Sequence, residues 1–229
     1  MFFRQLFEPD TSTYTYLVGD LLWREAAVID PVLGEVEEIL QTLEAEGLTL
    51  KTVMETHVHA DHVTGASALR ARTGAKVVVS RHGGAPCADL LVDDEDFLVL
   101  GDEVIRILAT PGHTPGCVSY RWRDRVFTGD ALLIGGCGRT DFQGGDAGVL
   151  YESITRKLFT LPEDTLVYPG HDYKGRRVSC IAEEKSRNPR LARKSREEFI
   201  AIMGELDLPK PRHIDVAVPA NQRCGAASA

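Results

Sequence analysis

One short stretch, dense in metal-binding side chains, constrains this sequence most. Residues 56–65 read THVHADHVTG and place His57, His59, Asp61 and His62 within six positions, directly after a predicted strand. Imidazole and carboxylate groups are the usual ligands of borderline divalent metals. In an extended chain His57 and His59 point to the same side, whereas the turn after Ala60 sends the next two groups elsewhere. The stretch therefore predicts a loop able to face two metal positions.

Three further polar residues occur in a similar context, each beside glycine at the end of a predicted strand. His113 lies in TPGHTPG, Asp130 in FTGD and His171 in YPGHD. Glycine and proline next to a polar group at a strand end are typical of a rigid loop that holds the group at a site. Together with the first stretch they make seven candidate metal ligands.

The rest of the pattern predicts an α/β or α+β chain with sheets covered by helices. Strands are expected at 13–17, 25–29, 49–54, 76–80, 103–108, 117–122, 125–128 and 166–168, with a turn at Gly19 and Asp20. Helices are expected from 36 to an end at Gly47 and at 65–72, 150–158 and 195–206, the last after a capping box of Ser195 and Glu198. Residues 135–148 are expected to form a surface loop, and the chain after Pro209 an irregular tail. We expect a core over residues 1–171 and a C-terminal helical extension over 172–229 on the same domain.

Composition excludes several classes of protein. The 229 residues carry a net charge of −8, which disfavours nucleic acid as a partner. The sequence has no apolar run near the ~18 residues of a membrane span and no signal-peptide pattern. We therefore expect a cytoplasmic protein without a membrane partner. Five widely spaced cysteines with no CxxC pair are expected to be free thiols.

Other polar residues are expected to have ordinary structural roles. Lone histidines are more often hydrogen-bonded structural residues than ligands, and this applies to His82 and His213. Cys137 has no identifiable base beside it and is expected to be a packed thiol. Four cationic side chains could bind an anionic substrate, and we expect at least one of them to do so. They are Arg139, Lys174, Arg176 and Arg177.

The motif series HxHxDH, PGHT, GD and PGH over residues 10–173 resembles the metallo-β-lactamase superfamily. This resemblance implies an αββα sandwich of two mixed β-sheets, with the metal at one edge. Further motifs are similar to those of the persulfide dioxygenases, a family within that superfamily. They are GCGRTDFQGGD, YPGHDYKG, NPRL, IMGELDLPKP and VPANQRCG, and they extend the resemblance over nearly the whole chain.

The resemblance to persulfide dioxygenases implies a mononuclear non-haem Fe(II) enzyme of sulfur metabolism and hydrogen sulfide oxidation. One iron per chain would be held by His57, His113 and Asp130. Glutathione persulfide would be oxidised with O2 and water to sulfite and glutathione. The remaining four candidates, His59, Asp61, His62 and His171, would orient the ligands and a bound water. The resemblance also suggests Arg139, Tyr173 and Lys174 as substrate-binding residues, and a homodimer.

Without the resemblance, the seven ligands favour a binuclear zinc hydrolase similar to glyoxalase II, which cleaves a glutathione thioester. In that alternative His57, His59 and His113 hold one metal. The other metal is held by Asp61, His62 and His171, and Asp130 bridges the two. A metal-bound hydroxide with its pKa lowered toward ~7 would attack the thioester carbonyl.

Overall fold

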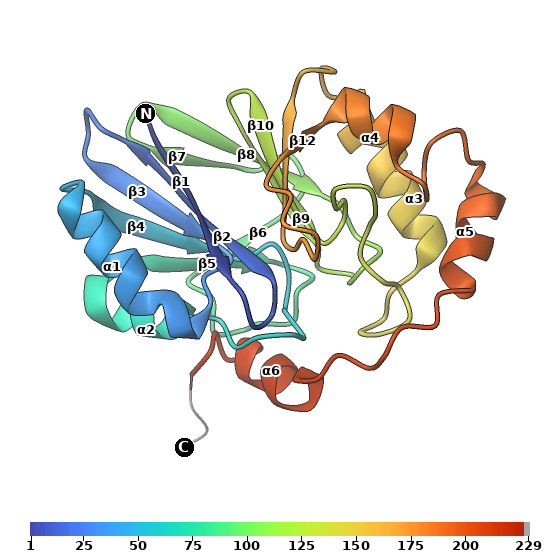
Figure 1. Ribbon diagram of the computed structural model, residues 1–229. Coiled ribbons are helices and arrows are strands. Elements are labelled where there is room, and N and C mark those ends of the chain that lie inside the picture. Colours follow the sequence, from blue (N-terminus) through green and yellow to red (C-terminus); the bar gives the residue numbers. More distant parts are fainter. Residues whose placement is uncertain (227–229) are drawn as a thin grey trace.

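The computed structural model describes residues 1–226 and is built on two six-stranded β-sheets that pack face to face (Figure 1). The first sheet follows chain order, with β1 (Phe2–Glu8), β2 (Thr13–Asp20), β3 (Glu25–Ile29), β4 (Thr49–Met54), β5 (Lys76–Ser80) and β6 (Leu90–Val92). The second has the order β12 (Ser179–Cys180), β11 (Leu166–Pro169), β10 (Arg125–Gly129), β9 (Val118–Trp122), β8 (Glu103–Ala109) and β7 (Phe97–Leu100). Each sheet contains parallel and antiparallel pairs, so both are mixed.

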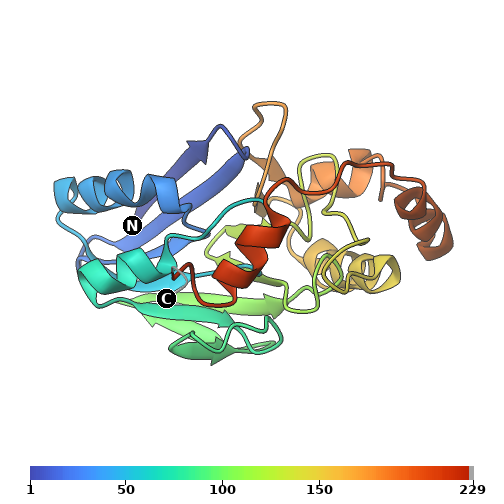
Figure 2. The same cartoon turned by 90° about the horizontal axis from the view of Figure 1, so that it is seen from below.

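Helices cover the outer face of each sheet. The first sheet carries α1 (Val36–Ala45) and α2 (Ala66–Thr73); the second carries α3 (Ala147–Arg156), α4 (Ile181–Arg187) and α5 (Arg196–Gly204) (Figure 1). Two single 3-10 turns lie at Leu33–Glu35 and Leu158–Thr160. The last helix, α6 (Ile214–Asn221), lies between the two helical sides of the molecule (Figure 2). This layering confirms the αββα sandwich expected from the resemblance.

Strand β2 shows how one segment serves two cores. Tyr14 and Tyr16 pack between the sheets in a cluster that includes Trp122 and Phe127. Leu17 points the other way, into the cluster beneath α1 and α2. Successive side chains of a strand alternate between faces, and both faces are covered here, so all eight residues of β2 are buried. A third cluster joins the second sheet to α3, α4 and α5.

Three predictions of local structure were wrong. Gly19 and Asp20 belong to β2, and the turn comes after them at residues 21–24. The chain after Pro209 is not wholly irregular, because α6 forms there with Pro219 in its last turn. A proline removes only its own N–H donor, and the helix continues through the bond from Gln222 N–H to the Val218 carbonyl. The loop at 135–148 is partly buried, at residues 136–138.

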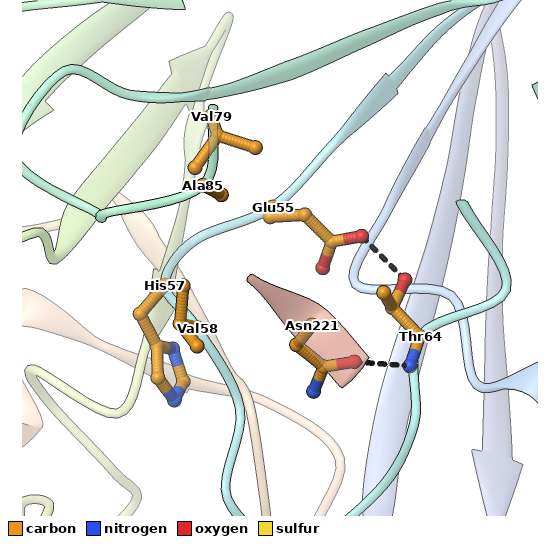
Figure 3. A pocket seen from close by; sticks show the side chains of 7 residues that line it. All are labelled: Glu55, His57, Val58, Thr64, Val79, Ala85 and Asn221. Atoms are coloured by element: carbon orange, nitrogen blue, oxygen red, sulfur yellow. Dashed lines mark hydrogen bonds between the residues drawn. The ribbon is translucent and has the colours of Figure 1, made fainter. Parts of the chain in front are cut away.

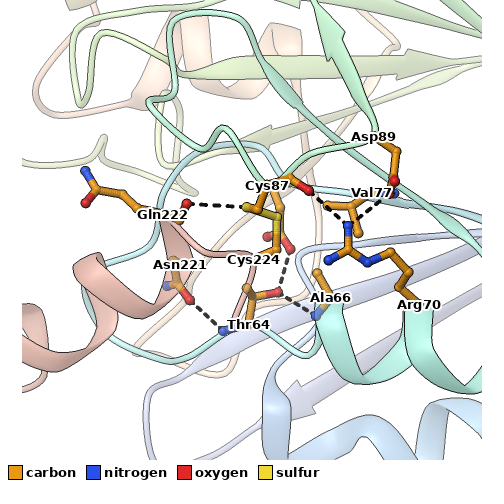
Figure 4. Close-up of a disulfide and its surroundings, with 10 residues drawn as sticks. Thr64, Ala66, Arg70, Val77, Cys87, Asp89, Asn221, Gln222 and Cys224 are labelled. Carbon is orange, nitrogen blue, oxygen red and sulfur yellow. Dashed lines mark hydrogen bonds and ion pairs between the residues drawn. A yellow bond between two sulfur atoms is a disulfide. The ribbon is translucent and has the colours of Figure 1, made fainter. Parts of the chain in front are cut away.

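The expectation of free thiols was wrong for two of the five cysteines. Cys87 and Cys224 form a disulfide across a sequence separation of 137 residues, which joins the segment between β5 and β6 to the chain just after α6 (Figure 4). Such a pairing depends on the tertiary fold, so spacing along the sequence carries no signal of it. Cys117, Cys137 and Cys180 are free. Among the described residues, no helix is long and apolar enough to span a bilayer.

Candidate metal centre

The candidate ligands lie in four loops at one edge of the sandwich. These loops follow β4, β8, β10 and β11, and backbone hydrogen bonds connect this edge both between the two sheets and within the second sheet. Val118 N–H donates to the Thr56 carbonyl and Gly170 N–H to the Gly129 carbonyl, both at 2.8 Å. Gly129 has φ of +49°, and a Cβ there would lie 2.4 Å from Thr56 Oγ1. Only glycine therefore lets the β10 loop approach the HxHxDH loop this closely.

Three of the seven candidates converge on one point. Donor atoms of His57, His113 and Asp130 lie within 4.8 Å of one another. The two imidazole rings have centroids 4.9 Å apart, and His113 Nε2 lies 3.7 Å from Asp130 Oδ2. His113 Nδ1 is 2.6 Å from the Arg139 carbonyl, and His57 Nδ1 is 3.0 Å from Thr56 Oγ1. Hydrogen bonds at both Nδ1 atoms leave the two Nε2 atoms for a metal.

The charge states of His57 and Asp130 suit a divalent cation. Burial, followed by the neighbouring His59 and His113, lowers the pKa of His57 well below its ordinary value, so the ring is neutral at pH 7. Burial opposes ionisation of Asp130, but His171 and then His113 outweigh it and lower the pKa of this carboxyl. A neutral imidazole and a carboxylate bind a metal without first losing a proton. The residues present therefore fit a metal ion.

His171 lies behind this group and bridges two carboxylates. Its Nδ1 is 2.7 Å from Asp130 Oδ1, and its Nε2 is 2.8 Å from Asp61 Oδ2 and 3.1 Å from Thr13 Oγ1. Burial lowers the pKa of His171, but Asp130 and Asp61 outweigh burial and raise it well above the ordinary value. Both ring nitrogens of His171 therefore have carboxylate partners, and one of these partners is Asp130.

His59 is held by two carboxylates that sequence reasoning missed. Its Nε2 lies 3.1 Å from Asp30 Oδ1 and 3.3 Å from Glu55 Oε2. Asp30 also accepts hydrogen bonds from the backbone and hydroxyl of Thr56. Each carboxylate follows a buried strand, β3 or β4, and that position is the one signal that could have found them. Burial lowers the pKa of His59, but Asp30 and Glu55 outweigh it and raise the pKa well above its ordinary value.

Comparison with known proteins agrees with this geometry. Residues 9–171 match the family model described as the metallo-beta-lactamase superfamily. Human mitochondrial persulfide dioxygenase ETHE1 is 53% identical over 225 residues, covering 97% of this chain and 88% of the human protein. The crystal structure of ETHE1 from Myxococcus xanthus superposes with a TM-score of 0.97 at 60% identity, covering 99% of this chain and all of that chain. This chain belongs to the persulfide dioxygenases of the metallo-β-lactamase superfamily.

Membership of the persulfide dioxygenase family establishes the class of reaction. The chain is an oxidoreductase, a metal-binding dioxygenase of sulfur metabolism, which confirms the prediction made from its motifs. A hydroxyacylglutathione hydrolase from Cereibacter sphaeroides is also similar, but at 35% identity over 185 residues, covering 79% of this chain and 71% of the hydrolase. The hydrolase alternative is therefore the less supported of the two.

A second group of possible ligands lies beside the first in this persulfide dioxygenase. Ligand atoms of His59, Asp61 and His62 also lie within 4.8 Å of one another. His62 Nδ1 is 2.8 Å from Asp61 Oδ2, and both His59 Nδ1 and His62 Nε2 are buried without a hydrogen-bond partner. Unlike the first group, this one includes a histidine, His59, whose other nitrogen faces two carboxylates.

Of the predicted substrate residues, Arg139 is already engaged. Its guanidinium pairs with both oxygens of Asp141 at 2.7 Å. It also donates to the carbonyls of Leu208 and Pro209 and lies over the ring of Phe142. Arg139 therefore ties the loop after β10 to the segment between α5 and α6, while its own carbonyl holds His113.

The other predicted substrate residues lie on the exposed side of the site. Tyr173 is 72% exposed, and its ring is nearly parallel to that of His171 with centroids 6.1 Å apart. Lys174 is exposed next to it. Arg176 pairs with Asp172. The exposed ring of Tyr173 therefore lies beside His171, one of the candidate ligands.

The residues expected to be structural lie away from the ligand group. His82 and His213 are exposed, and His82 Nε2 lies 3.8 Å from Asp93. Cys137 is buried with its Sγ 3.6 Å from Met203 Sδ, and burial raises the pKa of its thiol to about 11. A thiol with so high a pKa is a poor nucleophile, so Cys137 is a packing residue as expected.

Proposed function

We propose that this chain holds one ferrous iron on His57, His113 and Asp130 and oxidises glutathione persulfide with O2 and water to sulfite and glutathione. The observation that carries the proposal is the convergence of these three donor sets within 4.8 Å. Two imidazoles and one carboxylate form the ligand set of many non-haem iron oxygenases. When bound, such an iron would supply the redox chemistry by which O2 oxidises the persulfide sulfur.

The protein's own contribution is to hold these ligands in place. The Arg139 carbonyl fixes the ring of His113, and His171 fixes one oxygen of Asp130. Asp30 and Glu55 hold His59, and Asp61 holds His62. Partners of this kind orient the ligands, and their loss typically weakens metal binding or activity ~10- to 100-fold.

For substrate binding we propose Tyr173 and Lys174 as contacts on the exposed side of the site. Glutathione carries two carboxylates, so an acidic protein needs local cations to bind it. Lys174 is exposed and supplies one. Arg139 remains a proposed contact, but it would have to exchange one of its present partners for the substrate.

The decisive experiment is metal analysis of protein purified without added metal, combined with an oxygen electrode and a sulfite assay on glutathione persulfide. We expect about one iron per chain, oxygen uptake and sulfite release. His57→Ala should lose nearly all iron, whereas His62→Ala should keep much of it. Two metals per chain, one of them lost in His62→Ala, together with hydrolysis of lactoylglutathione and no oxygen uptake, would instead establish the binuclear zinc hydrolase.

Two further expectations from the sequence stay proposals. They are a homodimer and a cytoplasmic location. Light scattering of the purified protein tests the first, and fractionation of the source cells tests the second.

A further inference from the structure

The motif VPANQRCG has no part in the proposed chemistry. It contacts the loop that carries His57, His59 and His62. Asn221 is the last residue of α6 and is 5% exposed. Its Nδ2 donates to the carbonyl of His59 at 2.9 Å and to that of His62 at 2.8 Å. Its Oδ1 accepts from the N–H of Thr64 at 2.9 Å (Figure 4). One side chain thus binds three backbone groups of a single loop.

These three backbone groups lie in a stretch that is neither helix nor strand. Buried carbonyl and N–H groups in such a stretch need partners from elsewhere in the protein, because water cannot reach them. Asn221 supplies all three from a helix more than 150 residues further along the chain. The two carbonyls that it bridges flank Asp61, so its amide fixes the path of the loop between two histidines.

Asn221 also borders the small space behind the first ligand. A cavity of about 10 Å³, roughly the size of one water, is lined by Glu55, His57, Thr64 and Asn221 among others (Figure 3). The amide of Asn221 therefore lies on the side of the loop that faces this cavity, as does Glu55, the partner of His59. A shift of the loop at this point would move the histidines relative to His113 and Asp130, which stand on the other sheet.

The helix that carries Asn221 is anchored independently of it. The Cys87–Cys224 disulfide ties the chain after α6 to the segment between β5 and β6. Ser67 N–H donates to the Cys224 carbonyl at 2.8 Å, which joins the same point to α2. A Cβ at Gly225 would lie 2.1 Å from the Thr64 carbonyl, so the two segments are in close contact. Replacing Asn221 would leave this anchor in place.

We propose that Asn221 is a positioning residue that holds the metal-binding loop from the C-terminal helix. Its side-chain hydrogen bonds go to backbone groups, at residues 59, 62 and 64. The proposal rests on the proposed function only in taking the HxHxDH loop as the metal-binding one. It gives the C-terminal helix a specific part in metal binding that the ligand motifs do not reveal.

The test compares Asn221→Ala and Asn221→Asp with Val216→Ala, a control at a position on the same helix that is 67% exposed. Asn221→Asp keeps nearly the same volume and the acceptor for Thr64, but it replaces the two N–H donors by an oxygen facing two carbonyls. We expect both Asn221 variants to bind Fe(II) about tenfold more weakly in a chelator competition. In metal-free protein the amides of residues 59–64 should exchange faster. The visible absorption of the Co(II)-substituted protein, which reports metal geometry, should also shift.

Val216→Ala should match the wild type in all three measurements. The proposal would be overturned if Asn221→Asp had the Fe(II) affinity of the wild type, the same amide exchange rates at residues 59–64 and the same Co(II) spectrum. Should Asn221→Ala fail to fold, Asn221→Asp still decides the question, because it preserves the packing. Absence of sulfite release by the wild type, with Fe(II) binding still weakened in Asn221→Asp, would reject the proposed function and leave the positioning role standing.

Discussion

His171 Nδ1 lies 2.7 Å from Oδ1 of Asp130 and is the hydrogen-bond partner of that oxygen. The other carboxylate oxygen, Oδ2, faces His113. The motif series places His171 among seven similar candidate ligands. Its contacts differ from those of His57 and His113, since both of its ring nitrogens have carboxylate partners. This relationship supports the proposal that His171 orients Asp130 and does not itself bind the metal.

The first prediction compares His171→Ala with Asp130→Ala. Asp130→Ala removes one of the three proposed protein bonds to iron, so iron content should fall close to zero. His171→Ala removes only the partner of Asp130, so Fe(II) affinity should fall ~10- to 100-fold and iron should return when it is supplied in excess. Iron content of protein dialysed against graded Fe(II) checks this, with the exposed His82→Ala as the control. Equal and complete loss in both variants would make His171 a true ligand.

The second prediction concerns Arg139. If it grips a carboxylate of glutathione, Arg139→Ala should raise KM about ten- to hundredfold with little change in kcat, because the contact is equal in ground and transition states. Its bonds to Leu208 and Pro209 predict a second effect, a lower melting temperature, because the segment leading to α6 is released.

Asp141→Ala separates these two roles of Arg139. It frees the guanidinium for substrate while leaving the bonds to Leu208 and Pro209. We expect KM in this variant to be unchanged or lower. If Arg139→Ala lowers the melting temperature but does not change KM, Arg139 has a structural role and does not bind the substrate.

The third prediction is a maximum in the stability of the metal-free protein near pH 6.5. On the acid side, burial and then neighbouring histidines lower the pKa of His57, and burial and then His59 lower that of His62. The unfolded chain therefore takes up protons first as the pH falls below the ordinary histidine value of 6.5, and stability drops. Asp61 and Asp130, whose lowered pKa values depend on His171, add to the loss below their ordinary value of 3.8.

On the alkaline side the sign reverses. His59 and His171 have pKa values raised above 6.5 by their carboxylate partners, which outweigh burial. Their contribution is fully present below pH 6.5 and is lost as the pH rises through the raised folded values, because only the folded protein still holds these protons. Urea unfolding of metal-free protein from pH 3 to pH 9 measures both limbs. Stability that keeps rising above pH 7 would contradict the assignment of charge to His59 and His171.

The parts of the fold that the sequence predicts well are those with local causes. The strands at 49–54 and 76–80 are bounded by turn residues, and the capping box at Ser195 satisfies the first turn of α5 directly. Strand β1 was missed because its apolar residues occur in adjacent pairs, at 2–3 and 6–7, and therefore do not alternate with polar ones. Its place is set by antiparallel pairing with β2, which is a tertiary property.

The candidate site divides in the same way. All seven candidate ligands were found, because glycine-flanked histidine and aspartate at strand ends form a dense local signal. Asp30, Glu55 and Asn221 were not found, because a single polar residue acquires its role only through contacts far along the chain. The contacts of Arg139 with Leu208 and Pro209 are of this kind too, and neither its charge nor the family resemblance that suggested a substrate role indicates them.

The last prediction concerns the disulfide. Closing a loop of 137 residues restricts the unfolded chain, and the chain-entropy model gives about 5 kcal/mol for a loop of this length. Cys87→Ser should therefore lower the melting temperature by roughly 10 to 20 °C, whereas Cys180→Ser, at a free cysteine, should lower it far less. Thiol titration of the unfolded protein should find the three free cysteines without reductant and all five after reduction. Five thiols without reductant, and equal melting temperatures for the two variants, would show that Cys87 and Cys224 are unpaired in the protein as isolated and that α6 is held by Asn221 and packing alone.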